Sequence, residues 1–215
     1  MRRFVGATGS TTVHRPTCLR PGNPLEAEER MNDNARQYHR ILVTGNAGVG
    51  KSTVAAMIAE ELSLELFGLD AIVWQPGWKP TPAEERRLKI DEIVARPSWI
   101  VDGVSVRLWR AADLVIFLDY SRRVSLIRCA RRNWRYLFRS RPGLPEGCPE
   151  ILIIPTLLRI IWRFPTDVKP RLLADFMAPD DARRLIVVQN EDELDHLMAS
   201  VRQHSLNGRP ILAEG

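Results

Sequence analysis

The stretch GNAGVGKS, residues Gly45 to Ser52, decides the fold of this 215-residue chain. The apolar run Ile41–Val43 precedes it, and residues 52–62 follow it with apolar side chains at helical spacing. A short apolar run is typical of a buried parallel strand, and the spacing after it predicts a helix. The glycines allow a turn whose backbone N–H groups point inward, at the positive N-terminus of that helix. The pattern G-x-x-x-x-G-K-[ST] between a strand and a helix predicts a phosphate-binding loop, the P-loop.

The P-loop residues have separate expected parts in binding a nucleoside triphosphate. Lys51 is expected to reach the β and γ phosphates, and Ser52 to ligate Mg²⁺. Thr53 either contacts the α phosphate or bonds only within its own helix. The predicted cofactors are ATP and Mg²⁺, with no motif that selects adenine over guanine. The residues expected to bind them are Gly45, Asn46, Ala47, Gly48, Val49, Gly50, Lys51, Ser52 and Thr53.

Composition narrows the class of protein. Hydrophobic residues make up 45% and charged residues 27%, which is typical of a globular protein with a substantial core. The three cysteines are widely spaced and include no CxxC pair, which argues against a disulfide scaffold or a zinc site. Such cysteine usage fits a reducing compartment. No apolar run approaches the roughly 18–20 residues that span a bilayer. We therefore expect a cytoplasmic monomer without a membrane partner.

Strands that alternate with helices predict an α/β fold, a three-layer sandwich with a five-stranded parallel sheet. Residues 1–38 lack apolar periodicity and are expected to be a disordered extension. The domain is expected to cover residues 39–203, with a flexible tail at 204–215. The predicted strands are 41–43, 64–69, 98–103, 114–118 and 185–188. The predicted helices are 52–62, 81–95 with Thr81 as cap, 121–138, 151–163, 167–177, and 190–201 opened by Asn190 with Glu193.

A carboxylate from a neighbouring strand is expected to complete the Mg²⁺ shell. Asp102 and Asp119 both end apolar runs. Asp102 is preferred because Gly103 follows it, which permits close backbone approach, and because its strand is expected beside the P-loop strand. Asp119 is expected to cap the helix that follows Tyr120.

Six segments resemble the topology modulation protein family (FlaR-like), a branch of the adenylate kinase-like P-loop proteins. They are GNAGVGKST at 45–53, LDAIVWQPGW at 69–78, SWIVDG at 98–103, LVIFLD at 114–119, RPGLPEGCPE at 141–150 and WRFPTDVKPR at 162–171. The resemblance implies a nucleoside-monophosphate-kinase-like core with a helical lid at about 121–178. It also implies that Asp102 is the Mg²⁺-associated carboxylate and that the segment after Gly103 grips the acceptor, for which Arg107 is the candidate. The family's name concerns DNA topology.

Arginines crowd the segment after the fourth strand. In phosphoryl transfer, arginines position the phosphates and stabilise their charge. The resemblance implies that such arginines close onto the triphosphate, and Arg128 and Arg132 match best, with Arg131 as the nearest alternative. The other interpretations are a solvated basic helix and a nucleic-acid-binding face on which Trp134 and Tyr136 stack bases. The arginines are Arg122, Arg123, Arg128, Arg131, Arg132, Arg135, Arg139 and Arg141.

The predicted function is a Mg²⁺-ATP-dependent phosphotransferase, a kinase, whose catalytic residues are Lys51, Asp102, Arg128 and Arg132. Its expected partners are the triphosphate and a small acceptor such as a nucleotide. Asp70 follows the second strand and is expected to contact that acceptor. One alternative is a nucleotide-regulated ATPase or binding protein that affects DNA topology. Another is a small-metabolite kinase of shikimate or gluconate type, in which Asp70 contacts the acceptor hydroxyls.

Overall fold

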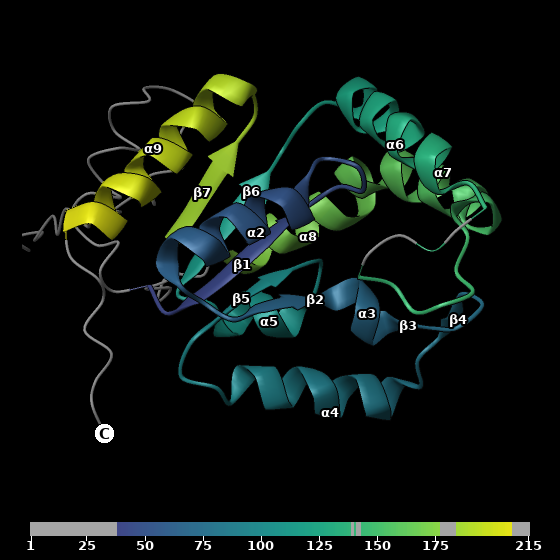
Figure 1. Ribbon diagram of the computed structural model, residues 1–215, viewed down its shortest axis with the longest axis horizontal. Helices are drawn as coiled ribbons and strands as arrows, with labels where there is room; N and C mark the ends of the chain where they lie inside the picture. Colours follow the sequence, from purple (N-terminus) through teal and green to yellow (C-terminus); the bar gives the residue numbers. More distant parts are fainter. Residues whose placement is uncertain (1–37, 139, 141–142, 177–183, 208–215) are drawn as a thin grey trace, which may run out of the picture.

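A computed structural model of the chain describes residues 38–138, 140, 143–176 and 184–207. Its centre is a five-stranded parallel sheet with the strand order β2-β5-β1-β6-β7 (Figure 1). The strands are β1 (Arg40–Gly45), β2 (Leu66–Gly68), β5 (Trp99–Asp102), β6 (Leu114–Leu118) and β7 (Arg184–Val188). The predicted α/β fold with five parallel strands is confirmed.

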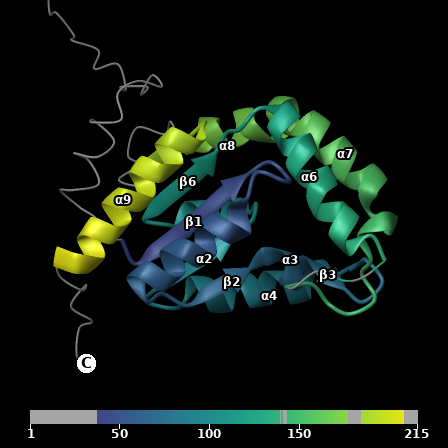
Figure 2. The same ribbon diagram turned by 45° about the horizontal axis from the view of Figure 1, so that its top comes forward.

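Helices cover both faces of the sheet, because alternate side chains of each buried strand point to opposite faces. Ile41 and Val43 of β1 pack with α2 (Lys51–Leu62) and α9 (Glu191–Asn207). Leu42, between them, belongs to the core on the other face, under α4 (Ala83–Val94), α5 (Val106–Ala111) and α8 (Lys169–Phe176). The result is the expected three-layer arrangement (Figure 2).

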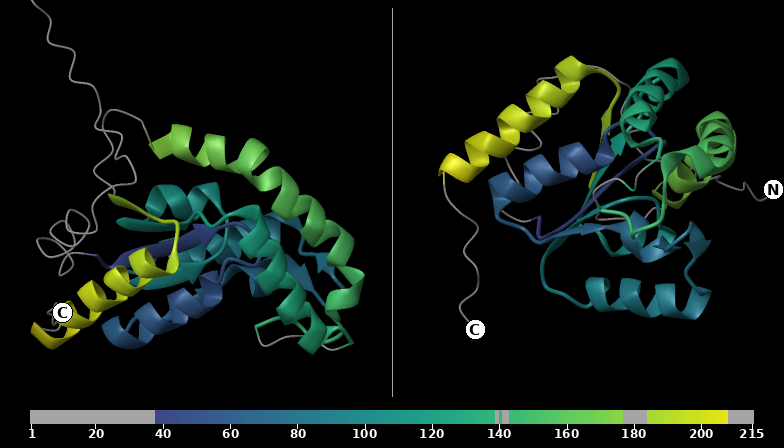
Figure 3. Two further views of the ribbon diagram at one scale, coloured as in Figure 1. Left: turned by 90° about the horizontal axis from the view of Figure 1, so that it is seen from above. Right: turned by 45° about the vertical axis from the view of Figure 1, so that its right-hand side comes forward.

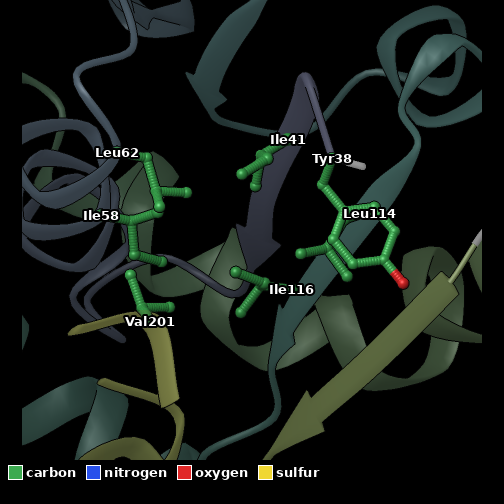
Figure 4. A pocket seen from close by; sticks show the side chains of 7 residues that line it. All are labelled: Tyr38, Ile41, Ile58, Leu62, Leu114, Ile116 and Val201. Atoms are coloured by element: carbon green, nitrogen blue, oxygen red, sulfur yellow. The ribbon is translucent and has the colours of Figure 1, made fainter. Parts of the chain in front are cut away.

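The core between β1, β6, α2 and α9 is nearly filled. Figure 4 shows the side chains around a small gap in it, among them Ile58, Ile116 and Val201. The cavity is ≈ 10 Å³, about the space that one water molecule occupies. An apolar gap of this size is a packing imperfection and cannot hold a ligand.

Helices α6 (Arg122–Tyr136) and α7 (Ile154–Arg163) lie side by side at the end of the molecule to which β1 and β6 point (Figures 1 and 3). A short 3-10 turn, η2 (Glu150–Leu152), precedes α7. A π-helical turn, η3 (Phe164–Val168), joins α7 to α8. The two helices predicted at 151–163 and 167–177 are therefore one helical run, in which the turn contains Pro165.

Three short elements were not predicted. Helix α3 (Leu69–Val73) and the hairpin of β3 (Trp74–Gln75) and β4 (Lys79–Pro80) occupy the segment between β2 and α4. Helix α5 replaces the acceptor loop expected after Gly103. Each element is too short to show a period in the sequence.

Two predicted helix caps are wrong and one is confirmed. Helix α4 begins where expected, but Pro82 is its N-cap and Thr81 makes no cap hydrogen bond. Ser121, not Asp119, caps α6 by accepting from the Val124 amide. At α9, the side-chain oxygen Oδ1 of Asn190 accepts from the Glu193 amide at 2.9 Å, as expected.

The predicted end segments are only partly within the described residues. The extension predicted as disordered lies outside them except for Tyr38, which packs against the core. Helix α9 continues to Asn207, past the predicted boundary at residue 203. The rest of the predicted tail, residues 208–215, lies outside the described residues.

Candidate functional site

The sheet register brings the predicted site residues to one edge. Asp102 is opposite Val43 of β1 on one side and Gly68 of β2 on the other. Gly45 is opposite Leu118, the last residue of β6. Because all five strands are parallel, their carboxyl ends form a single edge, which is where ligands bind in open α/β sheets.

The P-loop glycines hold conformations that other residues strain to adopt. Gly45 has φ +144°, and a Cβ there would lie 2.4 Å from the carbonyl oxygen of Leu118. Gly48 has φ +79°, and its Cβ would lie 2.5 Å from the Ser125 carbonyl oxygen of α6. The loop is therefore wedged between β6 and α6. Helix α2 begins directly after it with no side-chain cap at Gly50, so its first amides face the loop.

Two polar side chains hold the loop in shape. Lys51 Nζ donates to the Asn46 carbonyl oxygen at 2.7 Å. The buried Asn46 amide group donates to the Ile161 carbonyl of α7 at 3.0 Å and accepts from the Ala47 amide at 2.7 Å. The P-loop is thus tied to α7, 115 residues further along the chain. The motif predicts Asn46 only as a loop residue, and no sequence pattern indicates its contact with α7.

Ser52 and Asp102 meet at the start of α2. The Ser52 hydroxyl donates a hydrogen bond to Asp102 Oδ2, and Asp102 is half-buried. Asp119, the other candidate, instead forms an ion pair with Lys169 at 2.5 Å. A hydroxyl and a carboxylate are the hard oxygen ligands that Mg²⁺ takes when phosphates and water supply the others. Of the two carboxylates, the geometry favours Asp102 for that role.

The described residues contain no group of three His, Cys, Asp or Glu side chains able to hold a metal ion. Magnesium bound with a nucleotide does not need such a cluster, because one or two protein oxygens and the substrate phosphates suffice. The pair Ser52 and Asp102 therefore fits a metal that arrives with a triphosphate.

Arg128 lies directly on the P-loop. Its guanidinium donates to the Val49 carbonyl oxygen at 2.8 Å, pairs with Glu191 of α9, and stacks 4.5 Å from the Tyr120 ring centre. Burial raises the pKa of Tyr120, so its phenol is neutral under the arginine. Helix α6 thus places a cation beside the loop that the sequence assigns to phosphates.

The other predicted cations have different surroundings. Arg132 lies 3.5 Å from the fully buried Glu150. Arg131, the nearest alternative, is exposed on α6. Arg107, the predicted acceptor ligand, pairs with Asp91 of α4. The structure therefore brings Lys51, Ser52, Asp102 and Arg128 together, and Arg107 is directed to another helix.

The motifs at 69–78 and 141–150 pack on each other. The Trp78 indole donates to the Pro149 carbonyl at 2.8 Å, and its backbone amide lies 3.4 Å from Cys148 Sγ. Trp78 has φ +59°, a left-handed conformation that costs an ordinary residue about 1–3 kcal/mol. Trp74 meets it edge to face at 5.4 Å. Asp70 is exposed in the first turn of α3.

No family model and no curated protein matches this chain. Among solved structures, it is similar to shikimate kinase from Acinetobacter baumannii in complex with shikimate. That likeness has 16% identity over 84% of this chain and 97% of that one, with a TM-score of 0.47. A sugar kinase from Janibacter sp. has 20% identity over 81% and 98%, with a TM-score of 0.41. Deoxyadenosine kinase from M. mycoides with bound dATP has 17% identity over 79% and 100%, with a TM-score of 0.42. Such identities do not transfer a substrate.

Proposed function

We infer that this chain is a Mg²⁺-ATP-dependent phosphotransferase, a P-loop kinase. The observation that carries the proposal is the hydrogen bond between Ser52 and Asp102 at the start of α2, beside the glycine loop. The amides of residues 45–50 and the N-terminus of α2 fit the phosphates, and Lys51 has only to leave the Asn46 carbonyl to reach them. Arg128 is placed to neutralise charge at the same point.

Each residue has a defined part in this proposal. Bound Mg²⁺ would supply charge neutralisation on the phosphate oxygens. Ser52 and Asp102 hold and orient it, while Lys51 and Arg128 draw the transferred group toward the acceptor side. Catalysis of phosphoryl transfer requires mainly such positioning and electrostatic stabilisation.

The acceptor is proposed to be a small hydroxyl- or phosphate-bearing molecule. Asp70 follows β2, whose last residue Gly68 packs against Asp102: a Cβ at Gly68 would lie 3.3 Å from Asp102 Oδ1. An exposed carboxylate that follows β2 at this edge of the sheet supports an acceptor hydroxyl, as in a small-metabolite kinase, alongside the nucleotide acceptor of an adenylate kinase-like enzyme. The DNA-related alternative would need a basic surface that binds nucleic acid.

Membership of the topology modulation family is part of the proposal. The two most specific motifs, at 69–78 and 141–150, contact each other through Trp78, Cys148 and Pro149. This contact gives a structural reason for both motifs to occur in the same chain. The buried Cys129 and Cys148 are thiols that form no disulfide, which is compatible with the cytoplasm, and we propose the cytoplasm as the site of action.

The test uses ATP labelled at the γ phosphate, Mg²⁺ and two acceptor pools, one of nucleoside monophosphates and one of hydroxy acids and polyols. Mass spectrometry identifies the species that gains phosphate. Lys51→Ala should reduce transfer by at least about 100-fold, the usual scale for removing one transition-state charge contact. Lys89→Ala, an exposed lysine paired with Glu85 on α4, is the matched control and should leave transfer unchanged. Transfer that survives in Lys51→Ala would refute the site.

A further inference from the structure

Exposed apolar side chains gather around α6 and α7. Among the described residues, thirteen large apolar side chains are exposed, and eight of them lie between residues 127 and 162. Scattered exposed apolar residues are normal, but a cluster marks an interaction surface. The eight are Ile127, Trp134, Phe138, Ile151, Leu152, Leu158, Ile160 and Trp162.

Five of these side chains form what we call the outer face: Ile127, Trp134, Phe138, Leu158 and Trp162. Ile127 and Trp134 are seven residues apart and share one side of α6, and Phe138 follows in the turn after that helix. Trp134 and Leu158 both line a groove of ≈ 230 Å³ between α6 and α7. The Arg122 guanidinium, from α6, stacks 5.0 Å from the Trp162 ring on α7. These contacts join the exposed sides of the two helices, and Figure 3 shows that α6 and α7 lie side by side.

The outer face is bordered by positive charge. Arg123 and Arg131 lie four residues before and after Ile127, and both are exposed, as is Arg159 on α7. No described carboxylate forms an ion pair with any of the three. The sequence has no acidic residue in 121–145 or 151–166. Arg128 and Arg132 point the other way, to the P-loop and to Glu150, so the outer face is separate from the proposed catalytic site.

We propose that the outer face docks this protein on the surface of an anionic lipid bilayer. Tryptophan, phenylalanine and leucine side chains settle at the boundary between headgroups and acyl chains, and flanking arginines contact the lipid phosphates. Trp134 and Trp162, 82% and 65% exposed, are the two principal anchors. Such docking needs no spanning segment, and indeed the described part of the chain has no helix long and apolar enough to cross a membrane.

The distribution of charge on the outer face favours a bilayer over other binding partners. A second copy of the chain would bring arginine against arginine, with no acid on the face to compensate. Nucleic acid would satisfy the arginines but leave the aliphatic Ile127 and Leu158 without an apolar partner. A bilayer surface with both phosphates and hydrocarbon complements the arginines and the apolar side chains together. The absence of a membrane partner was expected from the sequence only because no apolar run is long enough to span a bilayer, and that criterion does not apply to surface docking.

The test measures binding of the full chain to vesicles of equal parts phosphatidylcholine and phosphatidylglycerol, by co-sedimentation and tryptophan emission. We expect binding with a blue shift that brominated lipid quenches, and little binding to phosphatidylcholine alone. Trp134→Glu should weaken binding at least about tenfold, since it replaces an inserted ring by a charge. Arg123→Gln with Arg131→Gln should weaken it roughly 25-fold, about fivefold for each arginine. Lys51→Ala should bind normally, which separates this proposal from the kinase activity.

Two matched controls test the location. Leu88→Glu changes another exposed apolar side chain (54%), on α4, and should bind like the unchanged chain. Arg86→Gln with Lys79→Gln removes the same charge as the double arginine variant but away from the outer face. Equal losses in test and control variants would overturn the proposal, as would equal binding to neutral and anionic vesicles. So would a dimer that Trp134→Glu dissociates, or binding to duplex DNA without binding to vesicles.

Discussion

Asp102 and Asp119 end the two strands that flank β1, yet their chemical surroundings differ. Asp102 accepts a hydrogen bond from Ser52, whereas Asp119 is paired with Lys169. A carboxylate paired with a lysine is partly neutralised before a metal arrives, whereas Asp102 lies beside a hydroxyl that can itself ligate Mg²⁺. The difference between these two residues is therefore a difference in what each can bind.

We expect Asp102→Asn to raise the Mg²⁺ concentration needed for half-maximal phosphate transfer by about 10- to 100-fold. The shape of the side chain and a hydrogen bond to Ser52 are retained, so the loss would reflect charge alone. The measurement is a Mg²⁺ titration of transfer at fixed ATP. Asp119→Asn is the matched control and should leave the Mg²⁺ requirement unchanged. A larger effect in Asp119→Asn would move the metal site to β6.

Residue roles set by a local motif could be predicted, and those set by distant contacts could not. Gly45, Lys51 and Ser52 follow from a contiguous pattern in which spacing encodes geometry. The contact of Asn46 with α7 joins residues 115 positions apart. Arg128 and Arg131 look alike in sequence, and only the packing of Ser125 against Gly48 determines which of them faces the loop.

At the scale of elements, strands and long helices were predicted and short elements were missed. Apolar runs such as LVIFL at 114–118 are buried on both faces and leave a clear signal. Helix α5 has six residues, and it forms because Leu108 and Trp109 fill the core beneath it while Ser105 caps it. Such an element depends on tertiary packing, because a single turn is not stable alone. The left-handed Trp78 of the β3–β4 hairpin is likewise held by contacts to Pro149 and Cys148.

The cap of α9 gives a test at this scale. Asn190→Ala should lower the free energy of unfolding by about 1 kcal/mol, because the Glu193 amide loses its acceptor. The measurement is urea denaturation monitored by circular dichroism. The slope of the unfolding free energy against urea concentration should be unchanged. Asn190→Ser keeps a short acceptor at the cap and should retain most of the stability. If the serine variant lost as much as the alanine variant, the cap would not be the source of the effect.

The whole molecule joins the loop, α6, α7 and α9 around a single point. Gly48 packs under α6, Asn46 bonds to α7, and Arg128 connects the loop with Glu191 of α9. A ligand bound in the loop therefore contacts a segment that is itself joined to α6, α7 and α9. Its binding energy should appear as global stability, and not only as a local ordering of the loop.

Mg²⁺-ATP at about a hundredfold excess over its dissociation constant should stabilise the fold by about 2.7 kcal/mol. For a domain of this length, that corresponds to a rise in Tm of roughly 5–10 °C. Thermal unfolding measured with and without Mg²⁺-ATP tests this, and Lys51→Ala should show little or no shift. Hydrogen exchange should slow in α6 and α7 as well as in residues 45–52, because the contacts of Asn46 and Arg128 transmit the ordering. A full thermal shift in Lys51→Ala would place nucleotide binding elsewhere, whereas slowed exchange confined to the loop would show that α6 and α7 do not act with it.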